Sequence, residues 1–145
     1  ERALCAALDR GLLVHVRTNL RAWHEGLLEA DVVSVDCYAH DRVAYARLTG
    51  VDAFEDVRAH LERLLEGRSL VGGMPTTWVV PRLTKRDDVY AHVEGFYDHW
   101  LRTCGACVID PLPAPIAGER IAPLPVPTSA SQRASRRRWG LLEDD

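Results

Sequence analysis

The chain is predicted to form an α/β domain built around a parallel sheet. Short runs rich in β-branched residues alternate with longer runs whose apolar residues recur at helical spacing. The strand-like runs are apolar on both faces, which is typical of strands buried in a parallel sheet. An open doubly wound sheet and a piece of a (β/α) barrel both satisfy this alternation, and periodicity alone does not separate them.

Four strands are predicted from the β-branched runs. They cover residues 12–17, 31–37, 74–81 and 106–110. A helix is predicted to end near Leu8, before Gly11, and a short helix is predicted around Trp23, Leu27 and Leu28.

Two longer helices are predicted at residues 53–66 and 85–103, because each places its apolar residues on one face. Asp52 is the expected N-cap of the first, and Glu55 completes a capping-box pattern with it. Thr84 is the expected cap of the second.

After Asp110 the composition changes. Six of the eight prolines lie between residues 111 and 127, which predicts an extended Pro-rich linker. A basic cluster follows, formed by Arg133, Arg136, Arg137 and Arg138. The chain starts with Glu1 rather than Met and stops without a turn signal, so we expect it to be cut from a longer protein.

Composition argues against several classes of protein. The net charge is −3 with a pI near 6.1, which predicts neither nucleic acid nor membrane as a partner. No apolar run approaches the roughly 20 residues that a membrane span needs, and no signal peptide is visible. Four cysteines are too few for a disulfide scaffold of 145 residues, so we expect a cytoplasmic protein with reduced thiols.

Polar side chains occur where the predicted strands end. Thr18 and Asn19 follow the first strand, Ser34 and Asp36 lie in the second, and Asp110 ends the fourth. Ligands of parallel α/β proteins bind at this edge, because loops and helix N-termini converge there. These residues are therefore candidates for a ligand site.

Three segments resemble radical S-adenosylmethionine (SAM) enzymes. VRTNL at residues 16–20 is similar to the strand end that reads TNG in that family, and residues 34–64 resemble the next unit, with its Ser-hydrophobic-Asp strand end. Residues 76–105 resemble the following strand and helix. The resemblance implies that residues 1–112 are the C-terminal portion of a partial (β/α) barrel. Residues 113–145 would then be the linker and the start of a SPASM-type domain.

The resemblance also implies a set of SAM-binding residues. Ser34 would contact the SAM ribose, and Arg47 would pair with the SAM carboxylate. The strand-end residues Thr18, Asn19 and Asp36 would contact the ribose or the substrate. The backbone near Val80 would line the adenine site.

Radical SAM chemistry, as the family implies it, uses a [4Fe-4S] cluster that donates an electron to SAM and releases a 5′-deoxyadenosyl radical. The CxxxCxxC segment that holds such a cluster is absent here, so this chain alone is predicted not to cleave SAM. The parent protein would act on a peptide, a protein or a small molecule, with flavodoxin or ferredoxin as electron donor.

Two other interpretations remain open. In the first interpretation, the chain is a non-catalytic α/β binding module, either a degenerate barrel or a flavodoxin-like domain. In the other it is an aldolase-type barrel that uses Asp36 or Lys85, which is the one lysine of the sequence.

Two further motifs are interpreted as structural. The CxxC pair Cys104 and Cys107 follows a predicted helix instead of preceding one, which is the reverse of redox CxxC motifs. His92 and His99 share a helix face beside its apolar stripe, so we expect half-buried packing residues and not metal ligands.

Overall fold

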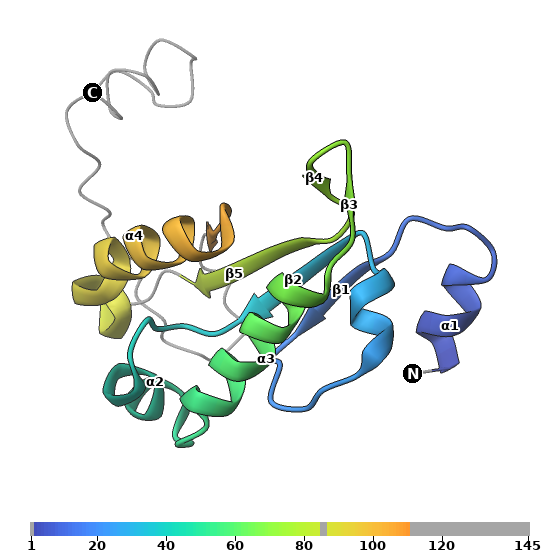
Figure 1. Cartoon of the computed structure of the whole chain (residues 1–145). Coiled ribbons are helices and arrows are strands. Elements are labelled where there is room, and N and C mark those ends of the chain that lie inside the picture. Colours follow the sequence, from blue (N-terminus) through green and yellow to red (C-terminus); the bar gives the residue numbers. More distant parts are fainter. Residues whose placement is uncertain (1, 85–86, 111–145) are drawn as a thin grey trace, which may run out of the picture.

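The computed structural model describes residues 2–84 and 87–110. These residues form twelve helices and strands, and Figure 1 labels the α-helices and the strands β1 to β5. They are, in chain order, α1 (Arg2–Leu8), β1 (His15–Thr18), the 3-10 helix η1 (Glu25–Glu29), β2 (Val32–Asp36), α2 (Arg42–Thr49), α3 (Phe54–Gly67), β3 (Leu70–Val71), β4 (Met74–Pro75), β5 (Trp78–Thr84), the 3-10 helix η2 (Asp87–His92), α4 (Val93–Cys104) and β6 (Val108–Asp110).

Four strands form one parallel sheet in the order β1-β2-β5-β6. The predicted α/β class, with parallel strands that alternate with helices, is therefore confirmed. The strand order follows the chain order, apart from the two short strands of a separate hairpin. Consecutive right-handed crossovers in one direction place their helices on the same face of the sheet.

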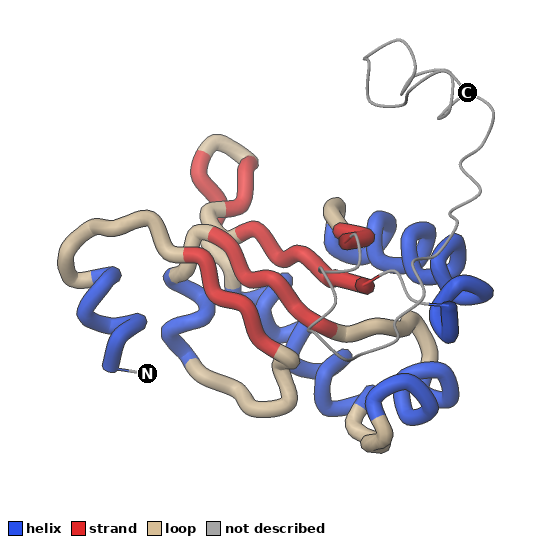
Figure 2. Tube along the Cα trace, turned by 180° about the vertical axis from the view of Figure 1, so that it is seen from behind, coloured by secondary structure: helices blue, strands red, loops and turns tan. Residues whose placement is uncertain are grey.

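Helices α3 and α4 lie on that face. Figure 1 shows α3 crossing in front of the sheet, and Figure 2, seen from behind, shows the strands in front of the helices. The two faces of the sheet also differ in how far their side chains are buried. Val33, Val35, Val79 and Leu83 point toward the helices and are fully buried, whereas Trp78 on the opposite face is 44% exposed.

The core lies between the sheet and these helices. It contains Val57, Leu61 and Leu64 from α3 together with Phe96 and Trp100 from α4. The Trp100 indole donates a hydrogen bond to the carbonyl of Ala39 at 3.0 Å, which ties α4 to the loop after β2. A buried indole N–H needs such a partner, so this contact fixes the position of α4 relative to the carboxyl end of the sheet.

The third strand of the sheet differs from its prediction. It begins at Trp78 and runs to Thr84, whereas residues 74–75 pair with residues 70–71 in an antiparallel hairpin. Gly72 and Gly73 connect the hairpin with φ values of 60° and 83°. Two consecutive residues with positive φ favour a tight hairpin turn, and glycine adopts that conformation without steric cost.

The predicted helix caps are wrong in both cases. Ala53 is the N-cap of α3 and makes no side-chain cap, because Asp52 accepts two hydrogen bonds from Arg42 at 2.8 and 2.6 Å. Thr84 is the last residue of β5, and α4 begins only at residue 93, after η2. Asp52 therefore forms a surface ion pair and Thr84 belongs to a strand, and neither residue caps a helix.

Helix α2 was not among the predicted helices. Asp41 caps it, since its carboxylate accepts a hydrogen bond from the backbone N–H of Ala44 at 2.8 Å. Gly50 ends it in the left-handed conformation.

Several predictions concern residues that the structure does not describe. They are the Pro-rich linker, the SPASM-type start at residues 113–145, the arginine cluster and Lys85. In the part of the chain that is described, no helix is long and apolar enough to cross a bilayer.

Replacement of Phe96 by alanine is predicted to lower the free energy of unfolding by about 3–5 kcal/mol, because a fully buried ring leaves a cavity between α4 and the sheet. Urea denaturation measures the change. Tyr97→Ala on the next residue is the control, since Tyr97 is 44% exposed and its loss should cost less than about 1 kcal/mol. Equal losses in the two variants would contradict the packing described here.

Candidate functional site

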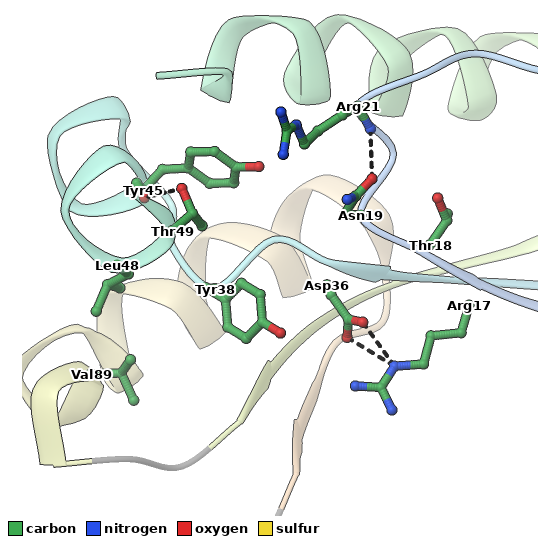
Figure 3. A pocket seen from close by; sticks show the side chains of 10 residues that line it. All are labelled: Arg17, Thr18, Asn19, Arg21, Asp36, Tyr38, Tyr45, Leu48, Thr49 and Val89. Atoms are coloured by element: carbon green, nitrogen blue, oxygen red, sulfur yellow. Dashed lines mark hydrogen bonds and ion pairs between the residues drawn. The ribbon is translucent and has the colours of Figure 1, made fainter. Parts of the chain in front are cut away.

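A cleft of about 580 Å³ opens at the carboxyl ends of β1 and β2 (Figure 3). The loop after β1, the end of β2, helix α2 and η2 all contribute side chains to it. The lining residues are Arg17, Thr18, Asn19, Arg21, Asp36, Tyr38, Tyr45, Leu48, Thr49 and Val89. Its position agrees with the general rule that ligands of parallel α/β proteins bind beyond the carboxyl ends of the strands.

The loop after β1 is held by its own side chains. The Thr18 hydroxyl accepts a hydrogen bond from the N–H of Leu20 at 2.9 Å, and the Asn19 side-chain oxygen accepts one from the N–H of Arg21 at 3.2 Å. Leu20 is fully buried with φ of 54°, and its carbonyl lies 2.9 Å from Nδ1 of His60 in α3. A left-handed leucine costs energy, so its burial and these hydrogen bonds are what keep the loop in place.

The end of β2 makes a second unusual turn. Tyr38 has φ of 56° and donates its N–H to the carbonyl of Arg82 in β5 at 3.3 Å. Tyr38 and Leu20 are the two non-glycine residues with positive φ among those described. Each follows one of the two strands that end at the cleft. Strained backbone of this kind clusters at functional sites, where surrounding contacts hold it.

The charged residues at this edge of the sheet form two ion pairs. Nε of Arg17 lies 2.8 and 3.1 Å from the two carboxylate oxygens of Asp36, and the hydrogen bond and charge of Asp36 raise the pKa of Arg17. Arg82 and Asp110 form the second pair at 2.7 Å, with both side chains about one-fifth exposed.

These four residues alternate in sign across the sheet order β1-β2-β5-β6. Asp36 and Arg82 are direct register partners, so the two ion pairs are neighbours. Each pair links residues two register positions apart on adjacent strands, a diagonal distance that long side chains span easily. The row lies on the face of the sheet that α3 and α4 do not cover.

Three of the six predicted SAM-binding residues meet in the cleft, namely Thr18, Asn19 and Asp36. The other three do not line it. Ser34 lies in the middle of β2, is 4% exposed, and its hydroxyl is 2.7 Å from Nε2 of His15. Val80 is the register partner of Ser34 in β5. Ser34 lies two residues before the end of β2, and Val80 lies four residues before the end of β5.

Arg47 lies in the last turn of α2. Its guanidinium is 2.6 Å from Nε2 of His92, at the junction of η2 and α4. Because arginine has no acceptor, this contact requires His92 to accept through Nε2. Tyr45, Leu48 and Thr49 of the same helix face the cleft instead.

Sequence analysis missed seven of the lining residues. Arg17 and Arg21 flank the Thr-Asn pair and Tyr38 directly follows the second strand, so their positions beside strand ends were a usable signal. The remaining four are Tyr45, Leu48 and Thr49 from α2, which was not predicted, and Val89 from η2, which lies inside the helix predicted at residues 85–103.

The two helical histidines belong to a group of three aromatic rings. His40 lies 6.4 Å from His92 and 6.1 Å from His99 between ring centroids. It packs directly on Gly95, where an added Cβ would come within 2.5 Å of the imidazole. Among the described residues, no group of three or more His, Cys, Asp or Glu side chains is arranged to hold a metal ion.

The cysteines in the described residues do not fit an iron–sulfur cluster. Cys37 and Cys104 are buried, and burial raises the pKa of both thiols, that of Cys104 to about 12. Cys104 ends α4 and Cys107 precedes β6, as the reversed CxxC order predicted. Cluster ligands are thiolates, and these environments disfavour the thiolate.

Scans of protein-family models, of curated proteins and of solved structures found no match to this chain.

Thiol reactivity should separate the cysteines. In the native protein we expect Ellman's reagent to modify the exposed Cys5 first, and to modify Cys37 and Cys104 only when denaturant unfolds the chain. The absorbance time course measures this order. Cys5→Ser should remove the fast phase, and rapid labelling of both buried thiols would contradict their burial.

Stability should fall as the solution is acidified through the histidine range. Burial, with a contribution from the charge of His40, lowers the pKa of His99 below its ordinary value of about 6.5. The unfolded chain then binds more protons than the folded one, so His99 favours unfolding as pH drops below that value. Denaturation at about pH 8 and about pH 5 should show a smaller loss for His99→Gln than for the native sequence. Equal losses would exclude His99 as a source of the effect.

Proposed function

We propose that this chain is the C-terminal part of a radical SAM (β/α) barrel, and that its cleft supplies polar contacts to S-adenosylmethionine. The observation that supports it most is the sheet itself. Four parallel strands adjoin in chain order, with α3 and α4 on one face. A barrel has this arrangement, and the face away from the helices becomes its interior.

Strand order also bears on the flavodoxin-like alternative. Doubly wound sheets bind ligands where the strand order reverses, with helices on both faces on either side of that point. The described strands contain no reversal. A degenerate barrel without SAM binding keeps the same sheet, so a binding measurement must separate it from the proposal.

The cleft has the size and chemistry for a nucleoside ligand. Its volume of about 580 Å³ lies within the range of small-molecule sites. The Asp36 carboxylate is an acceptor for ribose hydroxyls, and Asn19 supplies a donor and an acceptor. Tyr38, just after the carboxyl end of β2, adds an aromatic ring that can contact a base.

The iron–sulfur part of the family chemistry does not fit the described residues, since their cysteines form no ligand group. We therefore assign no electron-transfer step to this chain. Its proposed role is to bind and orient SAM, with cluster ligands supplied from elsewhere in the parent protein. A CxxxCxxC segment upstream of residue 1 in the full reading frame would support that role, and an intact upstream frame without one would contradict it.

The aldolase-type alternative has less support. Both carboxylate oxygens of Asp36 accept hydrogen bonds from Nε of Arg17, so a proton-transfer role would require this ion pair to open. The candidate Schiff-base residue, Lys85, lies outside the described residues.

Asp36→Asn is predicted to weaken SAM binding roughly tenfold or more, because the amide removes a charged acceptor facing the cleft. Equilibrium dialysis with labelled SAM measures the dissociation constant. Asp52→Asn is the matched control, since Asp52 also pairs with an arginine but lies outside the cleft. Saturable binding that is equal in all three proteins would remove Asp36 from the site, and no saturable binding would favour a degenerate barrel.

A further inference from the structure

We infer that Arg21 is the residue of the cleft that recognises an anionic group, and that this group is a carboxylate. The inference concerns the same cleft as the proposed function. The identity of the whole ligand as SAM rests on the proposed function. The assignment of a carboxylate to Arg21 does not depend on it.

The charges that line the cleft are unequal. Among the residues that the structure describes, three charged ones face it, namely Arg17, Arg21 and Asp36. Arg17 and Asp36 neutralise each other through two hydrogen bonds. Arg21 has no ion pair with any residue that the structure describes, so the described part of the lining carries one positive charge without an ion-pair partner. A ligand with a single negative charge complements it.

Arg21 is also placed with precision at its backbone. Its N–H is held by the side chain of Asn19, and the preceding Leu20 is fully buried in the left-handed conformation. The base of the side chain is therefore fixed, while the guanidinium extends over the cleft (Figure 3). A preorganised base reduces the entropy lost when the side chain closes on a ligand.

Tyr45 provides a second donor beside the guanidinium. Figure 3 shows its hydroxyl directed toward the guanidinium of Arg21 across the top of the cleft. Burial raises the pKa of Tyr45, and the positive charge of Arg21 opposes that shift, which places the two groups within electrostatic range. The hydroxyl is consequently neutral and able to donate a hydrogen bond.

This donor set matches a carboxylate best. A guanidinium binds the two oxygens of a carboxylate through parallel hydrogen bonds, and the tyrosine hydroxyl can donate a third. A phosphate dianion would keep one negative charge without a partner, because Asp36 already neutralises Arg17.

Arg21 takes the carboxylate-binding role that the family resemblance implied for Arg47. The family resemblance implied Arg47 for the SAM carboxylate, but Arg47 contacts His92 and does not line the cleft. If SAM is the ligand, its carboxylate would lie against Arg21.

The test uses the whole chain labelled with ¹⁵N and two kinds of probe. Sodium acetate is titrated at constant ionic strength against sodium chloride, and NMR follows the Arg21 backbone and guanidinium signals. SAM and decarboxylated SAM are then compared by equilibrium dialysis. The variants are Arg21→Gln, Arg21→Lys, Arg47→Gln and Arg10→Gln, the last being an exposed arginine outside the cleft.

We expect saturable acetate shifts at Arg21 that chloride does not reproduce. SAM should bind about tenfold more tightly than its decarboxylated analogue, and Arg21→Gln should abolish that preference. Arg10→Gln and Arg47→Gln should retain it, and Arg21→Lys should retain part of it, which would show that a loss in Arg21→Gln is not a folding defect.

The outcomes distinguish this inference from the proposed function. SAM binding without a carboxylate preference, or a preference lost in Arg47→Gln and kept in Arg21→Gln, would overturn the role of Arg21 and leave the proposed function standing. Acetate binding at Arg21 without SAM binding would overturn the proposed function and support the carboxylate site. The absence of both would overturn the two together.

Discussion

Strand β2 is the element on which the rest of the structure depends. It is hydrogen-bonded along both edges, to β1 and to β5, and its helix-facing residues Val33 and Val35 are fully buried. A parallel strand can occupy this position only if helices cover it, because its neighbours are connected by long crossovers. The packing of α3 and α4 on this face follows from that constraint. The cleft lies where β2 emerges from this packed region.

The segments that follow β1 and β2 show how the fold forms the cleft. Buried Leu20 after β1 and Tyr38 after β2 both adopt left-handed backbone conformations that their side chains disfavour. Hydrogen bonds to α3 and β5 hold these conformations, so the packing of distant elements stabilises the loops that line the cleft. The loops are thereby set before any ligand arrives, which is the general requirement for a selective site.

The row of alternating charges makes the face of the sheet away from α3 and α4 polar near the strand ends. Two neighbouring ion pairs, Arg17–Asp36 and Arg82–Asp110, lie on this face near the carboxyl ends of the strands. Partly shielded side chains in this row are more strongly coupled than ion pairs fully exposed to water. The row also neutralises Arg17, which leaves Arg21 as the charge that selects the ligand.

The sequence by itself determined the class of fold, the approximate positions of the four main strands, and three residues of the cleft. Period and composition suffice for this, because β-branched runs and apolar helix faces are local patterns, and strand ends of a parallel sheet meet at one edge. That rule selected Thr18, Asn19 and Asp36, and it also selected Ser34 and Asp110, which do not line the cleft. Only the tertiary structure decided which other residues join them. Helix α2 is short and was not predicted, and the side of it that faces the cleft depends on packing against α3 and η2. Arg47 and Tyr45 lie two residues apart on this helix, yet one contacts His92 and the other lines the cleft. Helix geometry makes residues two apart point to opposite sides, but packing against elements distant in the sequence decides which side faces the cleft.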